Sequence, residues 1–219
     1  MSTPISRRTL LQWLAGSLLI VGNRAVAGAF FLPKPGLQKV KGTVRINGKP
    51  AVEGQPVSWG DEVSTGANSE AVFTLESDAY LLRANSTVTL GVAAAEHFIK
   101  LQSGKMLSVF GPGPKTISTQ AVTLGIRGTG CYLEAHGRRS YVCLCYGSVV
   151  LVPTAAPQQK MEYSTTHHDS PYWIDGKKVI PAKEVINHTD DELIMLEALQ
   201  NRRPPFYQEE RVIKGGGGY

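Results

Sequence analysis

Short β-prone segments separated by turn-forming residues are the feature that most constrains the fold of this chain. Between residues 40 and 152, runs rich in valine, isoleucine, threonine and aromatic residues alternate with glycine, proline, asparagine and aspartate. Strands of about four to six residues, repeated every ~8–12 residues, are typical of β-sandwiches, barrels and solenoids. We therefore predict an all-β domain over residues 40–152, of the β-solenoid or β-sandwich type, with the glycines placed in its turns.

Two dipeptides predict β-hairpins. Asn47-Gly48 follows a short apolar run, and both residues accept the positive φ that a tight two-residue turn requires. Asp175-Gly176 stands between two further apolar runs and predicts a second hairpin over about 171–180.

The composition changes after residue 153, so residues 153–219 are interpreted as a C-terminal extension that contains the second hairpin. Thr189 followed three positions later by Glu192 forms a capping box, which predicts one α-helix over about 189–201. Gly215–Gly218 is predicted to be a flexible tail.

The first 27 residues have the features of an export signal. An apolar stretch ends in small residues at Ala27, and its length of about 12 residues is less than the ~20 that a membrane-spanning helix needs. We predict cleavage after Ala27, a periplasmic protein and no stable membrane span after cleavage; the alternative is an uncleaved anchor. The stretch that resembles the twin-arginine export motif is Ser6-Arg7-Arg8-Thr9-Leu10-Leu11-Gln12.

Composition and motifs exclude some function classes. The formal charge of +5 falls to +2 without Arg7, Arg8 and Arg24, and no basic stripe interleaved with aromatic residues remains to bind nucleic acid. No serine with a positioned base, acid pair or phosphate-binding loop is recognisable. We therefore predict a protein that is not an enzyme.

Two sequence blocks carry a family resemblance. Gly60–Gly66 has the form G-D-x-V-x-T-G, and Gly125–Thr129 reads G-I-R-G-T. With the segments 40–48 and 141–152 they resemble the FecR domain, the periplasmic β-rich module of iron-citrate regulators. The resemblance covers residues 40–152, about half of the chain.

The resemblance implies a fold and a role. It implies a non-catalytic binding, sensing or scaffold module of the bacterial envelope, with a link to the response to iron or another metal. Its expected partner is another envelope protein or a cell-wall glycan. Full regulators of this family carry a cytoplasmic anti-sigma segment and a membrane helix before this domain, whereas only the predicted signal stands before it here. Arg127, within the second block, is expected to have a structural role.

The cysteines raise a question of pairing. Cys143 and Cys145 are two residues apart on a predicted strand and therefore share one face. In the family pattern the aliphatic residues of this strand point to the core, which implies that both thiols point outward and that Cys131 points inward. A two-residue turn before this strand also sets Cys131 on the opposite face, whereas a loop with an odd number of residues sets it across from Cys143. A disulfide among the three cysteines and three plain thiols both stay open.

The alternative function is a metal-binding or redox sensor. Two thiols on one face are suited to a soft metal, and His167 or His168 could supply imidazole ligands. Consecutive histidines cannot both lie on one face of a strand, so at most one of them would bind comfortably unless that stretch is a turn. A site with Cys143, Cys145 and histidine would suit zinc or copper, and iron is the third candidate.

Overall fold

The computed structural model describes residues 35–93 and 96–208 of the 219-residue chain. The predicted signal motif at Arg7 and Arg8, the cleavage position after Ala27 and the glycine tail lie outside these residues. Within the described part of the chain, no helix is long and apolar enough to cross a membrane.

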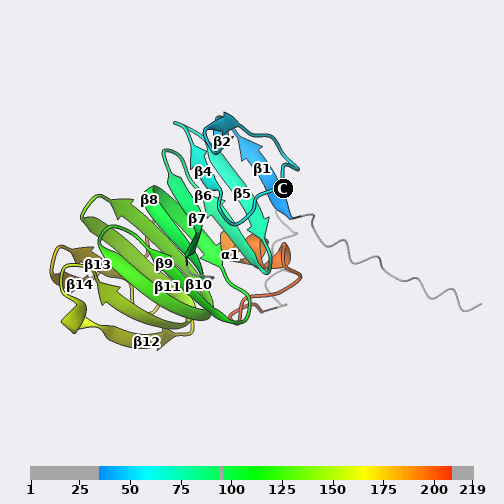
Figure 1. Ribbon diagram of the computed structural model, residues 1–219. Helices are drawn as coiled ribbons and strands as arrows, with labels where there is room; N and C mark the ends of the chain where they lie inside the picture. The colour runs from blue at the N-terminus through cyan, green and yellow to red at the C-terminus, as the bar shows by residue number, and fades with distance from the viewer. Residues whose placement is uncertain (1–34, 94–95, 209–219) are drawn as a thin grey trace, which may run out of the picture. The chain divides into compact units, whose positions relative to one another are not determined.

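The described residues form one hydrogen-bonded sheet of fourteen strands and a single α-helix near the C-terminus, which confirms the predicted all-β fold with one C-terminal helix (Figure 1). Neighbouring strands are antiparallel except for the parallel pair of β8 with β9. The strands are β1 (Gly36–Lys41), β2 (Val44–Ile46), β3 (Lys49–Pro50), β4 (Glu62–Thr65), β5 (Glu70–Leu75), β6 (Asp78–Leu82), β7 (Thr87–Ala93), β8 (Glu96–Val109), β9 (Pro114–Ser118), β10 (Val122–His136), β11 (Arg139–Pro153), β12 (Met161–Thr165), β13 (Tyr172–Asp175) and β14 (Lys178–Pro181).

The main path through the sheet runs β14-β13-β11-β10-β9-β8-β7-β4-β2-β3. Strand β12 pairs with β11, while β6 pairs with β8 and continues to β5 and β1. A short 3₁₀ helix, Pro157–Gln159, connects β11 to β12. The strands β12–β14 of the C-terminal extension therefore belong to the same sheet as the strands between residues 40 and 152.

Three strands are much longer than the sequence pattern predicts. Strands β8, β10 and β11 have 14, 15 and 15 residues, and the G-I-R-G-T block lies inside β10 instead of in a turn. The ladder between β10 and β11 shifts register between Arg127 and Cys131, and Gly128 and Gly147 have φ values of 57° and 95° there. These glycines form bulges that bend two continuous strands, so the expectation that glycines end the strands is wrong here.

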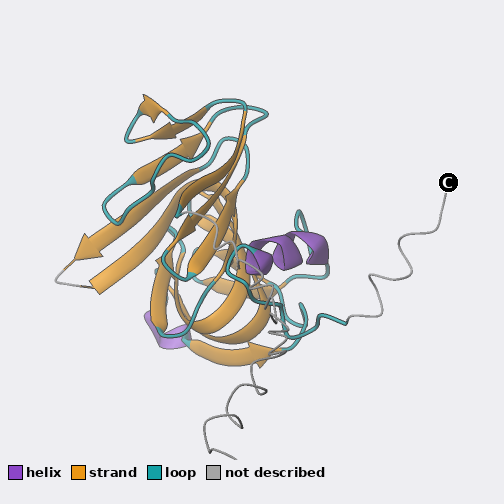
Figure 2. Cartoon of the chain, turned by 90° about the vertical axis from the view of Figure 1, so that its right-hand side faces the viewer, coloured by secondary structure: helices purple, strands orange, loops and turns teal. Residues whose placement is uncertain are grey.

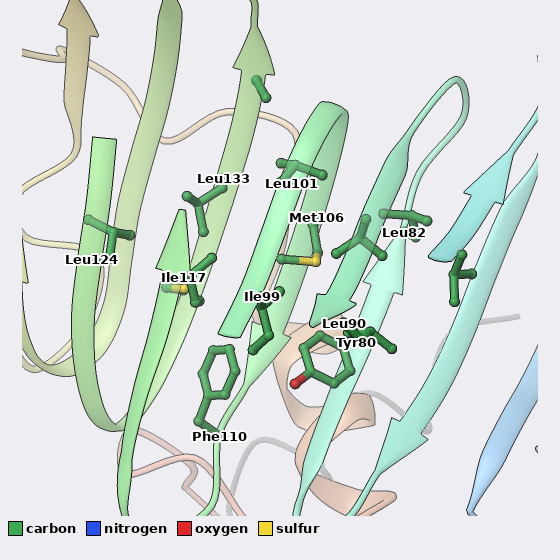
Figure 3. Close-up of a cluster of buried hydrophobic side chains, with 14 of the residues drawn as sticks. Tyr80, Leu82, Leu90, Ile99, Leu101, Met106, Phe110, Ile117, Leu124 and Leu133 are labelled. Atoms are coloured by element: carbon green, nitrogen blue, oxygen red, sulfur yellow. The ribbon is translucent and has the colours of Figure 1, made fainter. Parts of the chain in front are cut away.

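The sheet buries side chains on both faces. The inner cluster is the larger one and includes Leu101, Met106 and Leu133, whose side chains share one layer in Figure 3. The outer cluster lies on the opposite face and includes Tyr132, Cys143 and Cys145. The strands in this region are therefore covered on both sides, which explains why their sequences read as nearly continuous apolar runs.

Helix α1 (Asp190–Ala198) covers part of the outer face and packs over β6 and β8 (Figure 2). Its capping box is formed as predicted: the Glu192 backbone N–H donates to the Thr189 hydroxyl, and the Thr189 N–H donates to the Glu192 carboxylate. Leu193 and Leu196 are completely buried against the sheet. The helix ends at Ala198, with Leu199 as its C-cap, three residues before the predicted end at 201.

Candidate metal centre

The hairpin of β10 and β11 fixes the faces of the three cysteines. His136 pairs with Arg139 across a two-residue turn, and this register places Cys131 opposite Leu144 and Tyr132 opposite Cys143. Cys131 therefore belongs to the inner cluster, while Cys143 and Cys145 belong to the outer one. This is the arrangement expected for a two-residue turn, and it prevents a disulfide between Cys131 and either of the other two thiols.

The outer face at Cys143 and Cys145 is not open to solvent. Both side chains are 0% exposed, because residues that follow β12 and residues that precede α1 cover them. Each of these two covering segments brings one histidine to the thiols.

His168 comes from the turn between β12 and β13. Its backbone N–H donates to the carbonyl of Cys145 at 2.9 Å, and its φ of 53° is in the left-handed region. A non-glycine residue held in this conformation is a local strain that frequently marks a functional site. The conformation directs the ring inward, with Nδ1 3.4 Å from the Cys143 sulfur.

His188 is the residue immediately before the N-cap of α1. Its ring stacks on Tyr132 with centroids 4.4 Å apart, which fixes the plane of the imidazole. Nε2 of His188 lies 3.5 Å from the Cys145 sulfur and 3.2 Å from Nδ1 of His168.

These four residues bring two sulfurs and two ring nitrogens to one point. The donor atoms of Cys143, Cys145, His168 and His188 all lie within 4.8 Å of one another. Zinc binds sulfur at ~2.3 Å and imidazole nitrogen at ~2.0–2.1 Å, so the edges of a tetrahedral Cys₂His₂ site measure about 3.3–3.8 Å. The three distances of 3.2, 3.4 and 3.5 Å match those edges closely.

The outer nitrogen of each imidazole has a fixed partner. Nε2 of His168 donates to the Asp190 carboxylate at 3.1 Å, and Nδ1 of His188 donates to the carbonyl of Ile186 at 2.7 Å. Carboxylate and carbonyl oxygens only accept, so these ring nitrogens carry the protons. In the neutral form of each ring, the other nitrogen, which faces the thiols, then has a lone pair suited to a metal.

His167 lies outside this cluster. It is exposed, and its Nε2 donates to Asp190 at 2.8 Å. Asp169 accepts from the backbone N–H groups of Thr166 and His167 and thereby stabilises the turn. The carboxylate that accepts a hydrogen bond from the ring of His168 is that of Asp190. Of the two consecutive histidines, only His168 reaches the thiols.

The electrostatics of the pair of thiols are asymmetric. The hydrogen bond from Cys145 lowers the pKa of the Cys143 thiol and burial raises it, while the hydrogen bonds that His168 and His188 donate when their rings are doubly protonated lower it further. Burial raises the pKa of the Cys145 thiol well above its ordinary value. Burial lowers the pKa of His168, but its hydrogen bond and charge interaction with Cys143, together with Asp190, raise it overall. The cluster therefore favours a thiolate at Cys143, which is the form that binds metal.

Sequence reasoning missed His188 and Asp190. The capping box correctly predicts a helix start at Thr189, and a histidine beside that start was a usable signal. Nothing local in the sequence, however, shows that the start of this helix returns to β11 across the sheet.

A buried carboxylate lies next to the cluster. Glu134 is 3% exposed and accepts hydrogen bonds from Tyr132 and from Asn187, the residue before His188. Burial raises the pKa of Glu134, but the hydrogen bonds from Asn187, His136 and Tyr132 lower it below its ordinary value of 4.5.

This network predicts a pH dependence of stability. Because the pKa is lower in the folded chain, ionised Glu134 stabilises the fold above pH 4.5, and this contribution is lost as the pH falls through the folded-state pKa. Glu134→Gln is expected to cost about 1–3 kcal/mol of unfolding free energy at neutral pH, and the difference from wild type should shrink in acid. Urea unfolding of both proteins at several pH values measures this; a difference that does not change with pH would contradict the assignment.

Known proteins are similar to this chain only in part. No known family matches the chain, and no curated protein matches it significantly. Two crystal structures, each of a provisionally assigned anti-sigma factor from Parabacteroides distasonis ATCC 8503, are similar to it in part. One shares 13% identity over 56% of this chain with a TM-score of 0.48, and the other 12% over 62% with a TM-score of 0.49. The chain covers 59% and 64% of those two proteins.

Proposed function

We propose that this protein is a non-catalytic metal-binding module of the bacterial envelope, which holds one zinc ion with Cys143, Cys145, His168 and His188. The observation that carries the proposal is the convergence of four donor atoms within 4.8 Å of one another, from three separate segments of the chain. Clusters of this composition are the usual ligands of structural zinc.

The donor set argues for zinc and against a catalytic role. Two sulfurs and two imidazole nitrogens in tetrahedral positions suit zinc, and copper is the competing metal for such ligands. Catalytic zinc sites keep one position for water or substrate, whereas four protein ligands fill this one. All four side chains are buried or nearly so, which leaves a substrate no route to the metal.

The cellular setting is a proposal that rests on the sequence. The twin-arginine motif at Arg7 and Arg8 supports export to the periplasm, and this route carries folded proteins that have already bound their cofactors. The FecR-like blocks support a signalling role in the envelope, with a protein as the partner.

Elemental analysis of the purified full chain tests the proposal. We expect about one zinc per chain in the wild type and none in the double variant Cys143→Ser/Cys145→Ser. The matched control is Cys131→Ser, which removes a buried thiol from the opposite face and should keep its zinc. Cobalt in place of zinc should give the sulfur-to-metal charge-transfer band of a thiolate site in the wild type and in the control only.

The possible results separate clearly. If copper or iron is found at about one ion per chain and is lost in the double variant, the proposed site is correct but its metal is not zinc. No metal bound even after addition of zinc, with three free thiols counted after denaturation, would overturn the proposal. A circular dichroism spectrum of each variant shows whether it is folded.

Asp190 is predicted to position a ligand. Its carboxylate accepts from Nε2 of His168, and partners of this kind typically change metal affinity 10- to 100-fold. Asp190→Asn should therefore weaken zinc binding about 10- to 100-fold, as measured by competition with a chromophoric chelator. Asp191→Asn is the matched control: it removes the same charge from the same helix turn, but Asp191 is exposed. Equal losses in both variants would mean that only the charge at the helix start matters.

A further inference from the structure

Two parts of the fold that lie far apart along the sequence provide ligands of the candidate metal site. Cys143 and Cys145 belong to β11 in the sheet, whereas His188 belongs to the segment that leads into α1. A metal bound to both is a crosslink between the sheet and the start of the helix. The inference below rests on the proposed function.

The segment that this crosslink would hold covers an apolar surface. Leu193 and Leu196 of α1 are completely buried against the outer face of the sheet. Figures 1 and 2 show the helix lying against that face. The sheet residues of the outer cluster are Val72, Ala79, Leu81, Leu107, Val109, Tyr132, Tyr141, Cys143, Cys145 and Tyr146.

The helix itself contributes little to its own stability. It has nine residues, and isolated helices shorter than about 12–15 residues are marginal in water. Its stability therefore depends on tertiary contacts, which are the burial of Leu193 and Leu196 and the attachments at its two ends.

The two ends are held in different ways. At the C-terminal end, Glu197 accepts from Tyr146, Arg202 donates to the carbonyl of Ser77 at 2.7 Å, and Gln200 donates to the carbonyl of Asp78 at 2.8 Å. At the N-terminal end, Arg83 donates to the Glu192 carboxylate and to the carbonyl of Asn187, at a partly exposed position. The buried and partly buried attachments at this end are the hydrogen bond from Asn187 to Glu134, the stacking of His188 on Tyr132 and the Cys₂His₂ cluster.

The cluster holds the segment strongly only with a metal. Without one, the attachments available to the donor atoms are contacts between thiols and ring nitrogens at 3.4 and 3.5 Å, and thiols are weak donors. When both rings are neutral and protonated at their outer nitrogens, the facing nitrogens of His168 and His188, 3.2 Å apart, have no proton to share with each other. A metal replaces these weak contacts with four bonds.

We infer that metal binding controls the docking of this segment: zinc holds residues 186–199 on the outer face, and loss of zinc releases the N-terminal end of α1. Release uncovers the part of the outer cluster around Tyr132 and Cys143, while the C-terminal attachments and the inner cluster stay in place. The metal state is thereby converted into exposure of an apolar surface, which is the output that a sensing module requires.

Hydrogen–deuterium exchange of the full chain, zinc-loaded and after chelation, tests the inference. Chelation should speed amide exchange in peptides from residues 186–199 by about tenfold or more. Peptides from β2 and β4, whose buried hydrophobic residues belong to the inner cluster, serve as the internal reference and should not change. The Cys143→Ser/Cys145→Ser variant should exchange like the chelated wild type at all zinc concentrations, and Cys131→Ser should respond to zinc as the wild type does.

The outcomes distinguish this inference from the proposal on which it rests. If zinc binds at one ion per chain and exchange in residues 186–199 is the same with and without it, the inference is wrong and the metal site stands. If chelation speeds exchange in β2 and β4 as much as in the helix, the metal stabilises the whole fold and the inference of a local release is also wrong. If no metal binds, the proposed function fails first.

Discussion

Saturating zinc is expected to raise the apparent free energy of unfolding of this chain by about 4 kcal/mol when free zinc exceeds its dissociation constant about 1,000-fold. The physical reason is that the four ligands meet only in the folded chain, so zinc binds the folded state in preference to the unfolded one. For a chain of this size each kcal/mol shifts the thermal midpoint by about 2–4 °C, which gives an expected rise of about 8–16 °C.

Thermal unfolding with excess chelator and with buffered zinc measures this shift. The shift should be absent in Cys143→Ser/Cys145→Ser. It should be present in Cys131→Ser, whatever the thermal midpoint of that variant without zinc. A rise of the same size in the wild type and in the double variant would show that zinc acts elsewhere on the protein.

The substitution Gly104→Ala is expected to destabilise the fold by about 2–5 kcal/mol. Gly104 has a φ of 86° in β8, a conformation that costs a residue with a side chain roughly 1–2 kcal/mol. A Cβ there would lie 2.1 Å from the hydroxyl oxygen and 2.5 Å from the Cα of Ser86. Ser86 cannot easily move, because it is completely buried and its hydroxyl accepts from the backbone N–H of Lys105 at 2.8 Å. Overpacking of this kind adds about 1–3 kcal/mol.

Gly60→Ala is the control for this prediction. Gly60 has a φ of 101°, but no heavy atom lies within 4 Å of a Cβ built on it, so it tests the backbone strain without the steric clash. It should cost only about 1–2 kcal/mol. Urea unfolding of the three proteins gives the comparison, and equal losses in both variants would show that β8 moves away from Ser86 at little cost.

The parts of the fold that could be predicted from sequence are those specified by local chemistry. The hairpin of β13 and β14 is formed, although its turn is Gly176-Lys177 and Asp175 ends β13, and Thr189 with Glu192 does begin the helix. The lengths of β10 and β11 could not be predicted in this way. Glycine in a turn and glycine in a bulge look alike in one sequence, and pairing with the neighbouring strand decides between them.

The candidate site also has one part that local sequence predicts and one part that it does not. The spacing of Cys143 and Cys145 places both thiols on one face, and the two-residue turn at Gly137 and Arg138 decides that Cys131 lies on the other. His188 reaches the thiols because β13 pairs with β11 and the chain then returns over the outer face. That return depends on long-range packing, which periodicity and turn residues do not encode.

The order of the ligands along the chain has a consequence for how the protein is made. The thiols are synthesised first and His188 last, after every strand of the sheet has been completed. A chain that stops at Pro181 would contain the whole sheet and could not close the Cys₂His₂ cluster. If the proposed site binds zinc, metal uptake would distinguish chains that extend past His188 from chains that stop before it.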